Sequence, residues 1–261
     1  MDFEFKSEYN LDDLISIMRI LRSPNGCPWD KVQTHKSIRD NFIEETYEAV
    51  EAIDTEDSVL LKEELGDVLM QIIFHTLMEE EQGRFNFDSV CDGVCKKLII
   101  RHPHIFSDTT AETPEEVLKN WDNIKMEEKS QATFSDSVDS VAKSLPSLIR
   151  AQKVQKRASK AGMDFPSLDD AFDKISEETE ELKQAVSSND KDKLSDELGD
   201  LLFSVVNVAR FLKVDSEHAL YDATDKFATR FRKVETLCTE RGIDMKTADI
   251  SLIDSLWEEV K

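Results

Sequence analysis

Residues 44–48 read Glu-Glu-Thr-Tyr-Glu, and residues 63–67 read Glu-Glu-Leu-Gly-Asp. The pattern returns later in the chain, where residues 177–181 read Glu-Glu-Thr-Glu-Glu and residues 196–200 read Asp-Glu-Leu-Gly-Asp. The two copies are 133 residues apart (178 − 45 = 133). This one offset places Glu45, Glu48, Glu64 and Asp67 on Glu178, Glu181, Glu197 and Asp200. A repeat of this length is too long for a solenoid unit and indicates a duplicated domain.

These acids interrupt the apolar stripes of predicted amphipathic helices. In the second copy, Glu178 falls within a stripe of residues three or four positions apart: Leu168, Ala171, Ile175, Leu182 and Ala185. Glu197 falls in the same way within the next stripe, formed by Leu194, Leu201, Val205 and Val208. In the first copy, Glu45 lies between Phe42 and Ala49, and Glu64 lies between Leu61 and Val68. Stripe positions face inward, so the sequence predicts carboxylates on buried helix faces.

Buried carboxylates need a compensating partner, because an unpaired one costs several kcal/mol or stays protonated. Acids three positions apart project from the same side of a helix. The polar connection at residues 186–193 would fold two helices antiparallel and bring both acidic pairs together. A cation would relieve their repulsion, and oxygen ligands favour Mg²⁺, with Mn²⁺ as the alternative, over zinc. A charged outer face is the competing interpretation, but two copies with matched spacing favour a metal site.

The composition indicates a nearly all-α chain of two domains. Of 261 residues, 39% are hydrophobic and 34% are charged, and there are only seven Gly and six Pro. The formal net charge of −22 argues against binding to nucleic acid or to an anionic membrane, because both need a basic surface. No stretch approaches the length of a transmembrane helix, and the amino terminus lacks a signal-peptide pattern. We therefore expect a cytoplasmic protein.

The cysteines and histidines indicate no zinc site. The four cysteines show no disulfide framework and are expected to be reduced thiols (Cys27, Cys91, Cys95 and Cys238). Two of them could be combined with nearby histidines, but the spacing matches no common zinc pattern (Cys91, Cys95, His102 and His104). His75 lies in an apolar run, and we expect it to be a packed core histidine rather than a ligand.

The predicted organisation is an amino-terminal domain over residues 1–129, a serine-rich linker over 130–147 and a carboxyl-terminal domain over 148–261. In the first domain, periodicity predicts helices over residues 11–21, 36–53, 59–81, 87–100 and 114–129. In the second domain, it predicts helices over residues 148–160, 168–186, 191–212, 216–241 and 252–260.

A basic pair and a tryptophan follow each acidic segment. The cations of each pair are four positions apart and project to one side of a helix, where they could grip phosphate oxygens (Lys97 with Arg101, and Lys226 with Arg230). Solubilising charge is the simpler interpretation of one pair alone, whereas the duplication favours function. Each copy then ends in a helix with one tryptophan, Trp121 or Trp257, which could stack on a nucleobase or pack in the core.

Several motifs resemble one known family. The segment Arg22-Ser-Pro-Asn-Gly-Cys-Pro-Trp-Asp30, followed by Gln33-Thr-His35, resembles the amino-terminal signature of the MazG nucleoside triphosphate pyrophosphohydrolases. The Glu-Glu-x-x-Glu and Glu-x-x-Asp pairs resemble the metal-binding signature of the wider all-α pyrophosphohydrolase superfamily. Similarity continues through Arg101-His-Pro-His-Ile-Phe106 and Asn120-Trp121, and from Ala151 to Val260.

The resemblance implies Mg²⁺-dependent hydrolysis of nucleoside triphosphates to monophosphate and pyrophosphate, with broad base tolerance. It also implies a role in clearing aberrant nucleotides or in tuning nucleotide pools. In the second domain, the metal ligands that it implies are Glu178, Glu181, Glu197 and Asp200. The implied phosphate contacts are Lys226 and Arg230, and Trp257 would lie near the base. The equivalent set in the first domain is Glu45, Glu48, Glu64 and Asp67, with Lys97, Arg101 and Trp121.

The expected chemistry is metal-assisted attack of water on a phosphorus in line with the departing pyrophosphate. Glu177 is our candidate for orienting or deprotonating that water. One helix hairpin supplies half of a four-helix core, so we expect two tandem MazG-like domains that pack on dimerisation, most simply in a homodimer.

The second domain is the predicted principal catalyst. Asn207 is a polar residue in an apolar run and needs a partner, which a nucleotide or a neighbouring helix could supply, whereas its match in the first copy is Phe74. The resemblance also points to the second domain, although the first keeps every acid. A di-iron carboxylate bundle is disfavoured because it would need Glu-x-x-His pairs. A non-catalytic regulatory protein that binds nucleotide or metal is the remaining alternative.

Overall fold

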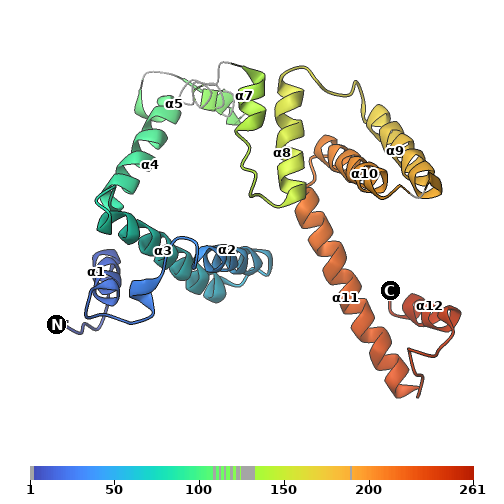
Figure 1. The fold of residues 1–261 in the computed structure, drawn as a ribbon, viewed down its shortest axis with the longest axis horizontal. Helices are drawn as coiled ribbons and strands as arrows, with labels where there is room; N and C mark the ends of the chain where they lie inside the picture. Colours follow the sequence, from blue (N-terminus) through green and yellow to red (C-terminus); the bar gives the residue numbers. More distant parts are fainter. Residues whose placement is uncertain are drawn as a thin grey trace. The chain divides into compact units, whose positions relative to one another are not determined.

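The computed structural model describes residues 3–107, 110, 111, 113, 114, 116, 117, 120, 121, 124, 133–188 and 190–261. All regular secondary structure in these residues is helical, which confirms the predicted all-α class (Figure 1). None of the described helices combines the length and apolar character needed to cross a membrane. The chain divides into two compact units, Met1–Lys125 and Met126–Lys261, and each is described by itself.

The described helices follow the predicted periodicity closely. In the first unit they are α1 (Leu11–Arg22), the 3₁₀ helix η1 (Asp30–Val32), α2 (Arg39–Asp54), α3 (Ser58–Glu81), α4 (Phe87–Arg101) and α5 (Pro103–Phe106). In the second unit they are α7 (Phe134–Asp139), α8 (Ser147–Lys160), α9 (Leu168–Ser188), α10 (Lys191–Phe211), α11 (Ser216–Glu240) and α12 (Ile250–Glu259). The predicted helix over 114–129 lies mostly outside the described residues.

The start of α2 differs from the prediction by three residues, Arg39 instead of Lys36. Thr34 and Ser37 exchange hydrogen bonds, in which each side-chain oxygen accepts from the backbone N–H of the other residue at 2.9 and 3.2 Å. Such local bonds compete with helical ones, so the chain turns here before α2 begins.

The described part of the predicted linker is structured. Thr133 and Asp136 form a capping box that starts α7. Arg157 of α8 donates a hydrogen bond to the carbonyl oxygen of Ser137, and the side chain of Val141 is buried. Residues 130–132 lie outside the described residues. The rest of the segment packs on α8 and belongs to the second unit rather than forming a plain connection.

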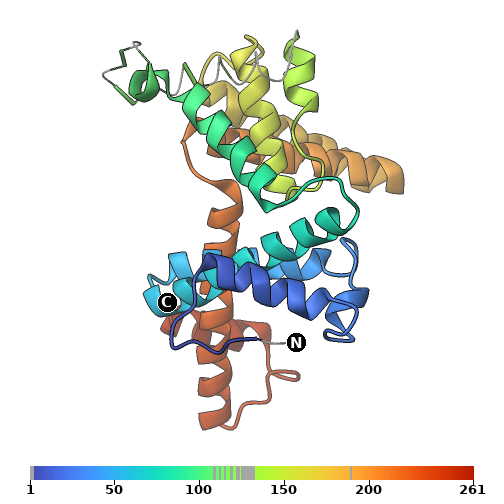
Figure 2. The ribbon, with the colours of Figure 1, turned by 90° about the vertical axis from the view of Figure 1, so that its left-hand side faces the viewer.

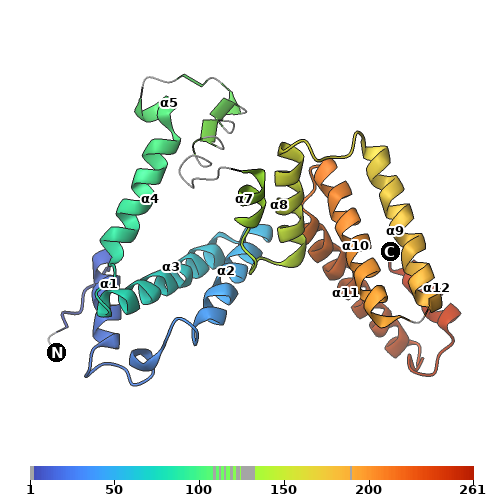
Figure 3. The same cartoon turned by 45° about the horizontal axis from the view of Figure 1, so that its top comes forward.

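Each unit contains one tightly packed helix pair, α2 with α3 in the first and α9 with α10 in the second (Figure 3). The later helix of each pair starts in the same way. Asp57 accepts hydrogen bonds from the backbone of Val59 and Leu60, and Asp190 accepts from Asp192 and Lys193. A side-chain cap at this point satisfies free backbone donors and allows a short turn between antiparallel helices.

The apolar cores lie beside these pairs. In the first unit, α1 packs on the second half of α3 around Ile15, Met18, Ile73, Phe74 and Leu77. In the second unit, α12 packs against the carboxyl-terminal half of α11 around Val234, Cys238 and Leu256 (Figure 2). One predicted core position is wrong, because Val205 is 47% exposed. The inward face of α10 continues through Ser204 and Val208, three and seven residues beyond Leu201.

Candidate metal centre

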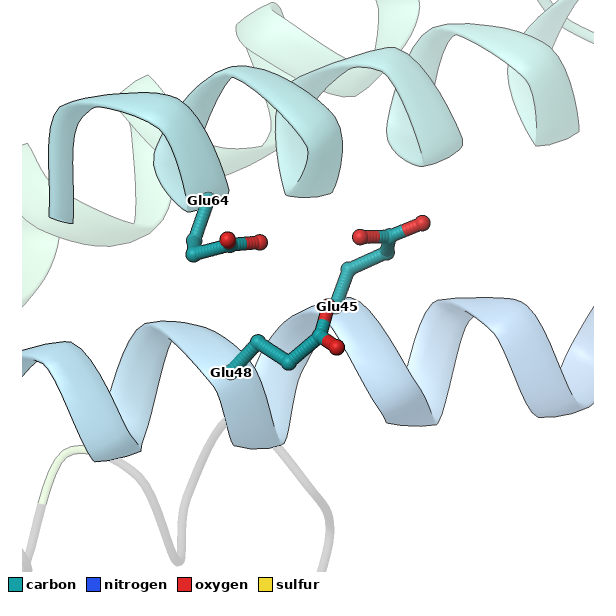
Figure 4. Close-up of side chains that lie close together, drawn as sticks. All are labelled: Glu45, Glu48 and Glu64. Carbon is teal, nitrogen blue, oxygen red and sulfur yellow. The ribbon is translucent and has the colours of Figure 1, made fainter. Parts of the chain in front are cut away.

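Three carboxylates of the α2–α3 pair converge. Glu45 and Glu48 on α2 and Glu64 on α3 each offer an oxygen, and these oxygens all lie within 4.8 Å of one another. Figure 4 shows Glu64 extending from α3 toward α2 and Glu45 extending from α2 into the space between the helices, with Glu48 beside α2. Because the acids are three apart on α2 and the helices are antiparallel, the hairpin fold alone brings the group together.

The first cluster is crowded with negative charge. Glu64 is only 8% exposed. Its burial raises the pKa of Glu64, and the charges of Glu48 and Asp67 raise it further. Burial and the charge of Asp67 likewise raise the pKa of Glu45, while a hydrogen bond from Gln71 opposes this effect. Asp67 therefore acts on the cluster electrostatically, although it lies outside the group of three.

The second cluster repeats this arrangement on α9 and α10. Oxygens of Glu178, Glu197 and Asp200 all lie within 4.8 Å of one another. Glu178 is 4% exposed, and its Oε2 is buried without a hydrogen-bond partner among the described residues. Glu181 borders this group, and its pKa is raised first by burial and then by the charges of Glu178 and Glu197. Each predicted set of four acids is thus found as three close carboxylates and one neighbour.

The donor set fits a hard divalent cation. All candidate ligands are carboxylates, and Oε2 of Glu178 is an acceptor that the described protein leaves unpartnered. A buried acceptor of this kind normally has a partner, and Mg²⁺ or Mn²⁺ binds such oxygens. Among the described residues, no comparable group includes cysteine or histidine.

Two lysines beside the second cluster were not singled out in the sequence. Nζ of Lys174 lies 2.6 Å from Oε1 of Glu178 and 2.9 Å from Oε1 of Glu177. Nζ of Lys193 lies 3.9 Å from Oε1 of Glu197. The hydrogen bonds to Glu178 and Glu177 raise the pKa of Lys174. Each lysine precedes its acid by four residues, and this spacing could have revealed both pairs.

The two predicted basic helices share a second feature. The Arg101 guanidinium lies 5.3 Å from the centre of the Trp121 ring, and the Arg230 guanidinium lies 5.9 Å from that of Trp257. Lys97 and Lys226 are exposed. Trp257 also packs against the α11–α12 core, so the packing role considered for it is present. In the part of the chain described, no ion pair joins Lys226 or Arg230 to the carboxylate cluster.

Asn207 is buried, as its position in an apolar run predicted, and its partner comes from its own helix. Nε of Arg210 donates to Oδ1 of Asn207 at 2.9 Å, and Arg210 also pairs with Asp164. The matched residue, Phe74, is buried in the first core with the Arg22 guanidinium 5.0 Å from its ring centre. Asn207 therefore organises an arginine that the first unit lacks at the matched position.

A cavity of about 600 Å³ lies further along the α2–α3 pair. Its apolar wall includes Phe42, Ile72 and Phe85, and its polar residues include His35 and His75. His75 was expected in the core; it is instead half-buried in the cavity wall, where it hydrogen-bonds to His35. Its place in an apolar run predicted burial, but the sequence could not show that a cavity lies beside α3 at this point.

Comparison with known proteins gives a consistent result. The family model described as "MazG nucleotide pyrophosphohydrolase domain" matches residues 33–106 and 168–235. The "Nucleoside triphosphate pyrophosphohydrolase" of Escherichia coli (strain K12) is 45% identical over 96% of this chain and 97% of its own length. The "Nucleoside triphosphate pyrophosphohydrolase/pyrophosphatase MazG" of Thermotoga maritima is 43% identical over 96% and 95%, respectively. "Uncharacterized protein YabN" of Bacillus subtilis is 45% identical over 94% of this chain and 50% of its own length.

Proposed function

Because this chain belongs to the family of MazG nucleotide pyrophosphohydrolases, we propose that it hydrolyses nucleoside triphosphates to nucleoside monophosphate and pyrophosphate, with Mg²⁺ as its cofactor. Mn²⁺ is the alternative cation. The observation that carries the proposal is that each unit brings three carboxylates within 4.8 Å of one another, one of which is buried: Glu64 in the first unit and Glu178 in the second. Such a site has no structural purpose that a well-packed apolar pair would not serve better, since close buried carboxylates repel one another.

In the proposed mechanism, Glu178, Glu181, Glu197 and Asp200 would hold the cation. When bound, it would neutralise the triphosphate and the departing pyrophosphate and so favour in-line attack. Glu177 is adjacent to Glu178, and its side chain is 57% exposed and pairs with Lys174 at 2.9 Å; in the proposed mechanism its carboxylate would exchange this contact for the proton of the attacking water. Lys226 and Arg230 would bind phosphate oxygens, because both cations project from the same side of α11.

The base would lie near Trp257, and broad base tolerance follows from this kind of contact. An aromatic face stacks on any nucleobase without reading its hydrogen-bonding edge. Arg230 already lies over the Trp257 ring, so one contact region could hold phosphate and base together. With such tolerance, we propose a role in clearing aberrant nucleotides or tuning nucleotide pools in the cytoplasm. The described cysteines are free thiols, as that compartment favours.

We assign the principal catalytic activity to the second unit. Its support is the unpartnered Oε2 of Glu178, together with the buried Asn207 that stands where the first unit has Phe74. The first unit keeps Glu45, Glu48, Glu64 and Asp67, and we propose that these acids form a second cation site.

A homodimer is the assembly that we propose. Helix α4 has no buried residue, although it carries several apolar side chains on its surface, including Val90, Val94 and Leu98. On α10, Leu198 and Leu202 are about half exposed, at 48% and 51%. Exposed apolar surface of this kind usually marks an interface, and a second helix pair would cover it in a four-helix core.

The test is pyrophosphate release from a panel of ribo- and deoxyribonucleoside triphosphates with Mg²⁺. We expect turnover of several bases, loss of turnover with a chelator, and recovery on adding Mg²⁺. If the protein binds triphosphates but releases no pyrophosphate at stoichiometric enzyme concentration, it is instead a regulatory nucleotide-binding protein.

A further inference from the structure

The two carboxylate clusters have matching acids but differ in the residues that stand four positions before two of these acids. In the second unit, Lys174 precedes Glu178 by four residues and forms an ion pair with it at 2.6 Å. In the first unit, the residue four before Glu45 is Asn41, which carries no charge. Likewise, Lys193 precedes Glu197, whereas Leu60 precedes Glu64. The second cluster therefore contains two ammonium groups at positions where the first has none.

The first cluster has no protein cation as a partner in the part of the chain that is described. No ion pair there involves Glu45, Glu48, Glu64 or Asp67. Glu64 is nevertheless 92% removed from solvent, since its exposed fraction is 8%. Its carboxylate faces the other two acids across the hairpin, as Figure 4 shows. Acids in this state gain most from an external cation, because a hydrogen bond from Gln71 to Glu45 offsets their repulsion only in part.

In the second cluster, an incoming cation meets a site that is already partly neutralised. Lys174 contacts Oε1 of Glu178 and also Glu177, and its own side chain is 33% exposed. A divalent ion bound through Oε2 of Glu178 would lie close to this ammonium group and be repelled by it, or would have to displace it. Either case lowers the affinity of the site for the ion.

We propose that Lys174, assisted by Lys193, acts as an internal counter-ion that weakens divalent-cation binding in the second unit, so that the nucleotide-free protein loads its first-unit site first. The inference rests on the proposed function only in taking a divalent cation as the occupant. It makes the two copies unequal in metal affinity although every acid is retained. At a given cation concentration, the site of the first unit would then be occupied more completely than the site of the second unit.

Titration of the full chain with Mn²⁺ and no nucleotide tests this inference, with free Mn²⁺ measured by electron paramagnetic resonance. We expect a tight and a weak binding phase whose dissociation constants differ by about tenfold or more, the order of effect expected from a unit charge close to a divalent ion. Glu64→Gln should remove the tight phase, and Glu197→Gln should leave it in place. Equal affinities, or loss of the tight phase in Glu197→Gln, would overturn the inference.

Reciprocal exchange of the matched residues gives the sharper test. Lys174→Asn should strengthen the weak phase about tenfold, and Asn41→Lys should weaken the tight phase by a similar factor. Asn41 is exposed and Lys174 is partly so, and circular dichroism of each variant verifies that it is folded. If neither exchange moves its phase, the lysine is not the cause and the inference fails. Pyrophosphate release, measured separately, decides the proposed function: turnover with equal Mn²⁺ affinities would refute only the counter-ion role.

Discussion

Nδ1 of His35 lies 2.7 Å from Nδ1 of His75, and the two imidazole rings are within 3° of parallel. At this distance one nitrogen donates a proton and the other accepts it, so the pair holds at least one neutral ring. On its other side, Nε2 of His35 lies 2.6 Å from Oε1 of Glu79. Arg84 also pairs with Glu79, and these contacts lower the pKa of Glu79 to about 2.

This arrangement predicts that His75 contributes a loss of stability on mild acidification. Burial, together with the charge of His35, lowers the pKa of His75 below its ordinary 6.5. The unfolded chain therefore takes up a proton below about pH 6.5 that folded His75 resists, and the free energy of unfolding falls from there downward. Protonation of Glu79 changes the free energy of unfolding only between pH 4.5 and about pH 2, so Glu79 does not contribute to the change near pH 6.5. Urea unfolding at pH 7.5 and pH 5.5 measures the change.

His75→Gln should reduce that pH dependence. His218→Gln is the matched control, because His218 is an exposed histidine on α11, and this variant should behave like the unaltered protein. A His75→Gln protein that keeps the full difference between pH 7.5 and pH 5.5 would contradict the assignment.

The assignment of catalysis to the second unit predicts that equivalent substitutions in the two units lower kcat unequally. Glu178→Gln removes a proposed metal ligand of the second unit and should lower kcat by at least about a hundredfold, since even indirect support of a metal ligand is commonly worth 10–100-fold. Glu45→Gln should leave much of the turnover. Steady-state pyrophosphate release measures both, and the reverse ranking would place catalysis in the first unit.

The assignment of Glu177 predicts a change in the rate of the chemical step. Glu177→Gln should lower kcat by about 10²–10⁴-fold, the usual worth of a general base. Glu180→Gln is the matched control, because Glu180 is an exposed acid on the same helix that pairs with Lys183. Equal effects of the two substitutions would remove Glu177 from the mechanism.

The role of the basic helix predicts weaker substrate binding. Arg230→Gln should raise KM about tenfold or more, because a charge-assisted contact to phosphate and a contact to Trp257 are both lost. Arg101→Gln, the equivalent change in the first unit, should leave KM within about twofold if the second unit is the catalyst. Michaelis–Menten kinetics with one triphosphate is the measurement, and similar KM values for both variants would contradict the assignment.

The loop after α1 offers a prediction about stability. A Cβ atom on Gly26 would lie 2.3 Å from the backbone carbonyl oxygens of Ile20 and Leu21. Gly26→Ala should therefore destabilise the protein by about 1–3 kcal/mol. Gly93 on α4 has nothing within 4 Å of such an atom, and Gly93→Ala should stabilise the protein by about 0.5–1 kcal/mol. Thermal unfolding measures both variants: the melting temperature should fall in Gly26→Ala and rise in Gly93→Ala.

Sequence periodicity predicted the helices because each apolar stripe is long and regular. The carboxylates could be placed together because acids three apart on two adjacent helices leave few other arrangements. The exposure of Val205 was not predictable, since residues 204, 205 and 208 are all compatible with one helical stripe and only packing selects among them. Lys174 was overlooked because a single i,i+4 ion pair is common on helix surfaces, and its significance depends on the burial of Glu178.

Both acidic clusters are built from helices that follow one another in the chain, with only a short turn between Asp54 and Ser58 in the first unit. Contacts this local form early in folding, because little chain entropy is lost in closing the turn. In the nascent protein, however, closing the hairpin drives carboxylates against one another. The rate at which the α2–α3 hairpin forms should therefore depend on the divalent cations present while the chain is folding, before any nucleotide is encountered.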